Sequence, residues 1–137
     1  RDARYSVMEI KWGLIPDLTG TKTLAEILPM DKVKELAMTG RIVDADEALT
    51  LGLVTRVCDD PVGEAQAMAE LFRGKSPDGL AGIKRVIQDN WNVDDDKALA
   101  RERRIQAKIL MGKNQRIAMQ ANFKKAQPEF KKRMNWD

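Results

Sequence analysis

Two carboxylates near the start of the chain are of a type that could carry out proton transfer. Glu9 lies in the segment 6–17, SVMEIKWGLIPD, between the apolar residues Met8 and Ile10, and Asp17 closes the segment. A carboxylate held between apolar side chains is costly to ionise, which suits it to taking and returning a proton near neutral pH. Glu9 is therefore a candidate general acid or base. The alternative is a solvated or helix-capping acid at the end of a strand.

Asp17 has two interpretations of equal weight. It is either a second carboxylate of the same site, or the N-cap of a helix predicted over 18–28. Hydrophobic periodicity supports that helix, and Pro29 must end it because a proline cannot continue the backbone hydrogen bonding. A second helix should follow, with Asp31 as its N-cap and Gly40 at its end.

Other kinds of active site are excluded by what the chain lacks. It has no histidine and one cysteine, Cys58. Ser-His-Asp and Cys-His catalysis, a structural zinc site and an internal disulfide are therefore ruled out, and no metal is expected. A single cysteine suits a reducing compartment. No apolar run reaches the roughly 18 residues of a membrane span. We expect a cytoplasmic protein with no membrane partner.

The residues 44–57 carry the clearest local signals. Asp44 and Glu47 form a D-x-x-E capping box, so a short helix should begin at Ala45 and end at Gly52. A short strand over 53–57 is predicted to follow. The pattern up to residue 60 is thus compact α/β.

From Pro61 the pattern is almost wholly helical. Helices are predicted over 62–73, 77–88, 95–111 and 114–126. The last two have thin apolar stripes on otherwise polar surfaces, which indicates that they pack against a partner subunit. We therefore divide the chain into residues 1–60, which carry the candidate site, and residues 61–137, a helical oligomerisation region.

The C-terminal part of the chain is basic although the net charge is only +3. From Arg101 onward there are eleven Lys/Arg against three acids. Such a tail could meet nucleic acid, a membrane surface or a small polyphosphate. Its cations are scattered without interleaved aromatic residues, so we expect no nucleic-acid partner.

Four segments, in order, resemble motifs of the enoyl-CoA hydratase/isomerase family, the crotonase superfamily. Residues 5–16 are similar to aromatic-x-x-P/M-E followed by G-L-x-P, and residues 38–57, MTGRIVDADEALTLGLVTRV, match the next family signature closely. Ser76-Pro77 with Lys84, and residues 123–130, follow in the family's order. The chain is identified as the C-terminal half of such a protein.

The resemblance implies an α/β, crotonase-like fold. Residues 1–60 would form the last turn of a ββα spiral, and residues 61–137 the helical region through which the family assembles. A homotrimer or a dimer of trimers is the implied assembly.

The resemblance also implies a reaction. Glu9 matches the family's second catalytic glutamate, which exchanges a proton with the α-carbon of an enoyl-CoA thioester through an enolate-like species. The coenzyme A thioester is the substrate, and no separate cofactor is implied. Asp17 departs from family hydratases, which usually have glycine there, and is similar to the dienoyl-CoA isomerase branch. Hydration, enoyl isomerisation and dienoyl isomerisation all stay open.

Three further residues are implied to bind substrate. Lys125 matches a C-terminal lysine that contacts a coenzyme A phosphate in relatives, and Phe123 would pack near the adenine. Trp12 would line the acyl pocket. The alternatives are a solvated lysine for Lys125, core packing for Phe123, and burial beside Met8 for Trp12.

The family's oxyanion-hole amides and first catalytic acid would lie upstream of Arg1. Donors aimed at the developing oxyanion are usually the largest catalytic contribution. We therefore expect this chain alone to be inactive. The alternative function is a catalytically weak or inactive crotonase-fold assembly or binding module with a basic tail.

Overall fold

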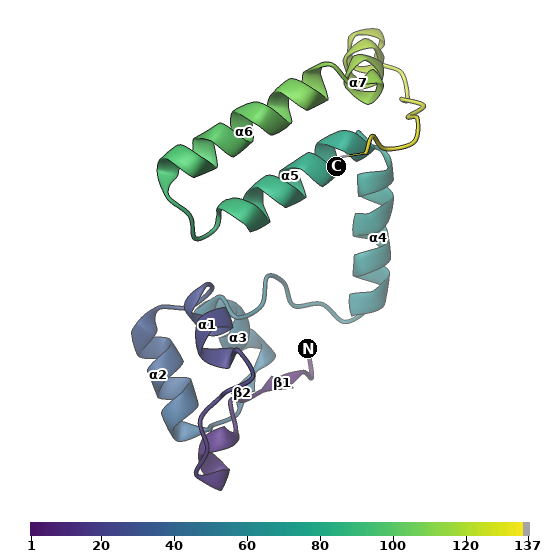
Figure 1. Cartoon of the computed structure of the whole chain (residues 1–137). Coiled ribbons are helices and arrows are strands. Elements are labelled where there is room, and N and C mark those ends of the chain that lie inside the picture. Colours follow the sequence, from purple (N-terminus) through teal and green to yellow (C-terminus); the bar gives the residue numbers. More distant parts are fainter. Residues whose placement is uncertain (136–137) are drawn as a thin grey trace. The chain divides into compact units, whose positions relative to one another are not determined.

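The structure, a computed structural model, describes residues 1–135 and divides into two compact units, which are treated separately (Figure 1). The first unit comprises Arg1–Glu64 and the second begins at Ala65. The elements of the first unit are β1 (Arg4–Tyr5), the 3-10 helix η1 (Glu9–Trp12), α1 (Gly20–Ala25), α2 (Met30–Thr39), β2 (Val43–Asp44) and α3 (Ala45–Leu51).

The sheet of the first unit has two short antiparallel strands. Arg4 of β1 lies opposite Asp44 of β2, and Tyr5 lies opposite Val43. A small core packs beside this pair. Its buried residues are Leu28, Leu36, Val43 and Ala48. Because they come from α2, β2, α3 and the turn after α1, this core holds the helices of the unit against the sheet.

The capping signals of α3 are confirmed. The Asp44 carboxylate accepts a hydrogen bond from the Glu47 backbone N–H at 2.8 Å, and Gly52 ends the helix at φ 85°. The helix begins at Ala45, as predicted. The Glu47 carboxylate does not complete the box but accepts from Arg41 at 2.6 Å.

Three predictions for the first unit are wrong in detail. No strand is assigned over 53–57, because the N–H groups of Leu53 and Val54 both bond to the carbonyl of Ala48 and so extend the end of α3. The helix predicted over 18–28 is shorter, since only Gly20–Ala25 is helical. α2 begins at Met30 with Pro29 in the N-cap position, two residues before the predicted cap Asp31.

Gly40 brings the end of α2 against η1. It is buried, with φ 58°, and a Cβ at this position would lie 2.8 Å from Cγ2 of Ile10 in η1. The hydroxyl of Ser6 donates to the Gly40 carbonyl oxygen at 3.0 Å. The segment that leads into Glu9 is therefore fixed by one hydrogen bond and one close apolar contact.

The second unit is helical among the described residues. It contains most of α4 (Pro61–Arg73), then α5 (Pro77–Asn90), α6 (Asp95–Leu110) and α7 (Lys113–Lys124), followed by an extended C-terminal segment. The predicted start of α5 is confirmed, since the Ser76 hydroxyl accepts from the Gly79 N–H and Pro77 is the first helical residue. Figure 1 shows α5 and α6 side by side.

Two buried polar side chains tie the C-terminal segment to these helices. Asp78 of α5 is 2% exposed and Asn114 of α7 is 1% exposed. The Asn114 amide donates to Asp78 at 2.9 Å and exchanges hydrogen bonds with the backbone of Lys131. The N–H of Met134 donates to Asp78 at 2.7 Å. Every one of these groups is satisfied within the unit, as buried polar groups require.

Much of the apolar surface of α4 and α5 is exposed. α4 has no buried residue, and Ile83 and Ile87 of α5 are exposed on an open groove of about 450 Å³ between α5 and α6. The described part of the chain does not cover these side chains. Within residues 1–135, no helix has the length and apolar character that would let it cross a membrane.

Two glycines beside η1 provide a matched test of its packing. Replacing Gly40 by alanine should destabilise the protein more than replacing Gly13, which has φ 68° but open space around its missing Cβ. Both changes carry the left-handed backbone penalty of about 1 kcal/mol. Only Gly40→Ala adds the clash with Ile10, worth about 1–3 kcal/mol. Urea unfolding followed by circular dichroism measures both, and equal losses would contradict the close contact.

Candidate active site

Glu9 lies at the start of η1 rather than at the end of a strand. β1 ends at Tyr5, and the predicted strand end at Glu9 is wrong because the chain turns into the 3-10 helix there. Gly13 ends this helix, and its backbone N–H donates to the Ile10 carbonyl oxygen at 3.0 Å. Within residues 1–135 the half-buried Glu9 carboxylate has no side-chain hydrogen bond or ion pair. It is therefore available to a ligand.

The apolar neighbours of Glu9 are open in this chain. Met8 and Ile10 are exposed, and Trp12 is 79% exposed at the other end of η1. The alternative in which Trp12 is buried beside Met8 is wrong for this chain. Exposed apolar side chains around a carboxylate form a surface that an apolar ligand or further protein could cover.

Asp17 is exposed in the turn before α1 and does not cap that helix. Thr19 holds the N-cap position, so the capping interpretation of Asp17 is wrong. Thr19 adopts φ 64°, which is strained for a β-branched residue. Its hydroxyl lies 3.4 Å from that of Thr23. Since Asp17 does not cap α1, only its interpretation as a second carboxylate of the site is left.

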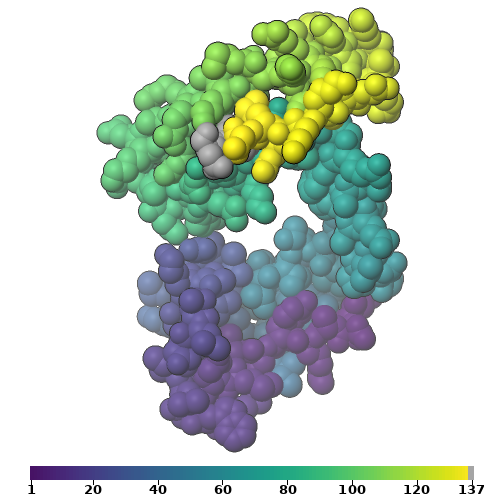
Figure 2. All heavy atoms as spheres, turned by 45° about the vertical axis from the view of Figure 1, so that its right-hand side comes forward, coloured from purple at the N-terminus to yellow at the C-terminus, as the bar shows by residue number. Residues whose placement is uncertain are grey.

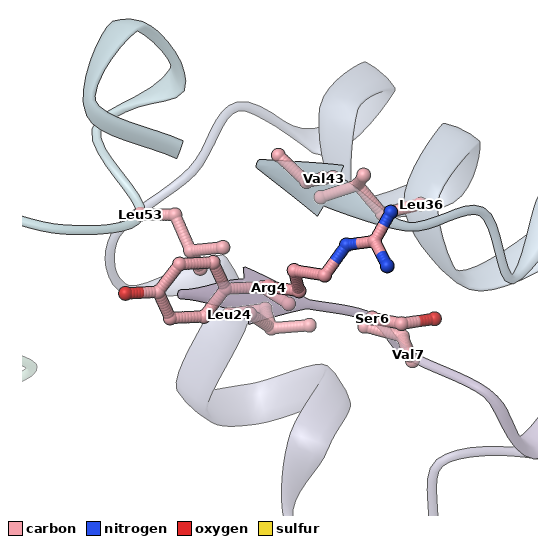
Figure 3. Close-up of a pocket in the computed structure, with 8 residues that line it drawn as sticks. Arg4, Ser6, Val7, Leu24, Leu36, Val43 and Leu53 are labelled. Atoms are coloured by element: carbon pink, nitrogen blue, oxygen red, sulfur yellow. The ribbon is translucent and has the colours of Figure 1, made fainter. Parts of the chain in front are cut away.

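A pocket of about 360 Å³ opens behind the segment that leads to Glu9 (Figure 3). Its residues come from β1, the chain after it, α1, α2, β2 and the chain after α3. They are Arg4, Tyr5, Ser6, Val7, Leu24, Leu36, Val43 and Leu53. Arg4 is the one charged residue of this set. Glu9 does not line the pocket, so the pocket and the carboxylate are separate features of the unit.

Arg41 fixes the chain beside Gly40. Its guanidinium donates to the carboxylates of Glu35 in α2 and Glu47 in α3, the latter at 2.6 and 2.9 Å. The hydrogen bond from Arg41 holds the pKa of Glu35 below its ordinary value, and the two carboxylates raise the pKa of Arg41. Arg41 directly follows Gly40, so these bonds tie the residue after the glycine to both α2 and α3.

Sequence reasoning predicted Gly40 as the end of α2, which the structure confirms, but it missed the contact of Gly40 with η1. The positioning roles of Arg41 and Ser6 were missed entirely, and Arg41 was noted only within the family signature at 38–57. The available signal was the pair Gly40-Arg41 directly after a predicted helix, with Glu35 before it and Glu47 after it as possible partners of the arginine. Ser6 had no such signal, because its partner Gly40 is distant in the sequence.

Phe123 and Lys125 lie at the end of α7 in the second unit. Lys125 is exposed and ends the helix with φ 50°. Phe123 is 81% exposed, so its interpretation as a core residue is wrong for this chain. The first unit brings Glu9 and Trp12 together on η1, with Asp17 in the turn that follows. Among residues 1–135, no three His, Cys, Asp or Glu side chains are gathered as a metal site would need.

Comparison with known proteins places this geometry in a family. The family model described as enoyl-CoA hydratase/isomerase matches residues 1–133. A probable enoyl-CoA hydratase of Mycobacterium leprae is 31% identical over 130 residues, covering 93% of this chain and 51% of that protein.

Solved structures agree with this match. An enoyl-CoA hydratase from Mycobacterium marinum superposes with a TM-score of 0.87 at 27% identity, covering 95% of this chain and 52% of that one. One from a Polaromonas species gives 0.85 at 30% identity, covering 94% and 51%. The chain spans about half the length of the relatives that it matches. It belongs to the enoyl-CoA hydratase/isomerase family and carries the C-terminal half of the crotonase-like fold.

Proposed function

We propose that this chain supplies the acid–base half of an acyl-CoA-processing active site, in which Glu9 exchanges a proton with the α-carbon of an enoyl-CoA thioester. The observation that carries the proposal is the placement of Glu9. Its half-buried carboxylate has no side-chain partner among the described residues, and it stands at the head of a helix held by Gly40.

The chemistry suits a carboxylate that no other group engages. Loss of the α-proton leaves an enolate-like species, and the base must lie within hydrogen-bond reach of that proton. A carboxylate already bonded to an arginine, such as Glu35 or Glu47, is poorly placed to accept it. Glu9 has no such competitor.

The other half of the site is proposed to come from residues outside this chain. Stabilising the developing oxyanion requires preorganised donors. The relatives are about twice as long as this chain, which is consistent with donors supplied elsewhere in the fold. Trp12, Lys125 and Phe123 are proposed to contact the acyl-CoA, Trp12 at the acyl chain and the other two at the nucleotide end.

The exposed apolar side chains of the second unit support assembly. Met111, Phe123, Ile83 and Ile87 are exposed on α5, on α7 and after α6. A homotrimer or a dimer of trimers would cover such side chains, and we propose that assembly for the protein that holds both halves of the fold.

Replacing Glu9 by glutamine should abolish turnover in a protein that holds both halves. The amide cannot accept the proton, so the rate on crotonyl-CoA or 3-enoyl-CoA should fall by about 10² to 10⁴. Steady-state kinetics with size-exclusion chromatography measure activity and assembly together. Glu70→Gln, on the exposed face of α4, is the control. Unchanged turnover in Glu9→Gln would sink the assignment.

Asp17→Asn should separate the branches of the family. If Asp17 is the second carboxylate of a dienoyl-type site, the rate on 3,5-dienoyl-CoA should fall about 10²-fold while the rate on crotonyl-CoA changes little. Asp31→Asn, another exposed acid of the first unit, is the control. Equal effects on both substrates would argue against the dienoyl-type role.

The 137-residue chain alone should show no turnover. Its carboxylate would lack the oxyanion donors, which are worth about 10² to 10³ in rate for each donor in comparable sites. Hydration of crotonyl-CoA followed at its thioester absorbance tests this. Measurable turnover by the purified chain, abolished in Glu9→Gln, would show that the proposed division of the site is wrong.

A further inference from the structure

A pocket lined by lysines lies in the second unit, beside the buried residues Asp78 and Asn114. It has a volume of about 480 Å³ and is formed by the end of α6, the start of α7, Asp78 of α5 and the C-terminal segment. Figure 2 shows the C-terminal segment, in yellow, lying across the helices of this unit. The basic residues lining the pocket are Lys108, Lys113, Lys131 and Lys132.

Three of these lysines have no counter-ion. Within residues 1–135, no carboxylate lies within ion-pair distance of Lys113, Lys131 or Lys132, whereas arginines of the same unit, such as Arg73 and Arg101, are paired with acids. The first turn of α7, which also lines the pocket, carries no acidic residue. Positive charges gathered in a concave surface raise the local concentration of anions.

The buried pair Asp78 and Asn114 in the pocket lining fixes the backbone that carries Lys131. Asn114 accepts from the Lys131 N–H at 2.8 Å and donates to its carbonyl oxygen at 3.1 Å. Met134 is held by Asp78 and passes so close to Gly112 that a Cβ there would lie 2.6 Å from its terminal methyl group. The backbone that carries Lys131 is therefore set before any ligand arrives, which lowers the entropy cost of binding.

The Asp78 carboxylate on the same wall does not cancel this charge. It is 2% exposed, and its two oxygens accept from the Asn114 amide and the Met134 N–H. One buried carboxylate stands against the three lysines that have no counter-ion, Lys113, Lys131 and Lys132, so the pocket keeps a net positive charge.

We propose that this pocket binds a phosphate group, either as inorganic phosphate or as the phosphate ester of a small molecule. Lysine ammonium groups bind phosphate as point charges, and three such groups without a counter-ion suit a ligand that carries more than one negative charge. Neither Glu9 nor Lys125 lines the pocket, so the inference stands apart from the proposed reaction.

Calorimetric titration of the whole chain with inorganic phosphate, pyrophosphate and adenosine 3′,5′-bisphosphate at constant ionic strength tests the proposal. We expect saturable binding with 1:1 stoichiometry, weakened at least about tenfold in Lys113→Gln/Lys132→Gln. Tighter binding of the bisphosphate than of phosphate would identify an ester as the ligand. Equal affinities would identify the free phosphate group.

The matched control is Lys75→Gln/Lys124→Gln, which removes the same charge from the same unit outside the pocket. Its affinity should stay within about twofold of the parent chain. An equal loss in both double variants would mean non-specific attraction to a basic surface and would overturn the proposal. So would the absence of saturation at about 10 mM phosphate. Circular dichroism checks that all variants keep their helical content.

Discussion

The contact between Gly40 and η1 is the constraint on which the candidate site depends. A carboxylate can act as a base only where its backbone is held, and the backbone at Glu9 is held from one side by the end of α2. The Ser6 hydroxyl donates to the Gly40 carbonyl oxygen itself, and the hydrogen bonds of Arg41 tie the next residue to α2 and α3. Because Gly40 has no side chain, the end of α2 can approach η1 closely enough to fix the position of η1.

The local parts of this fold could be predicted from the sequence because their causes are local. A carboxylate that accepts from the N–H three residues later, as Asp44 does, favours the start of a helix through a contact within four residues. Ser76 and Pro77 act in the same way. The strand expected over 53–57 failed because a strand needs a neighbour with free backbone groups, and the capped end of α3 used those of this segment instead.

The candidate site shows the same division between local and distant causes. The residue type at Glu9 could be predicted from its neighbours, and so could the resemblance to a family. Its support by Ser6 and Gly40 depends on two segments meeting across 34 positions, which no short pattern encodes. Asp17 was given a capping role because a helix was expected directly after it. The left-handed Thr19 delays the helix, and so leaves the carboxylate without that role.

The hydrogen bond between Met134 and Asp78 has a consequence for the order in which the second unit folds. It joins positions 56 apart, so forming it closes a long loop, which costs conformational entropy. Before the C-terminal segment is in place, the Asp78 carboxylate lacks the Met134 N–H as a partner, and the Asn114 side chain lacks the backbone of Lys131. Docking of the C-terminal segment dehydrates both at once, so this last step changes an ordinary polar helix surface into an interior. The rate of that step, more than the rate of helix formation, should set how soon the unit reaches its final packing.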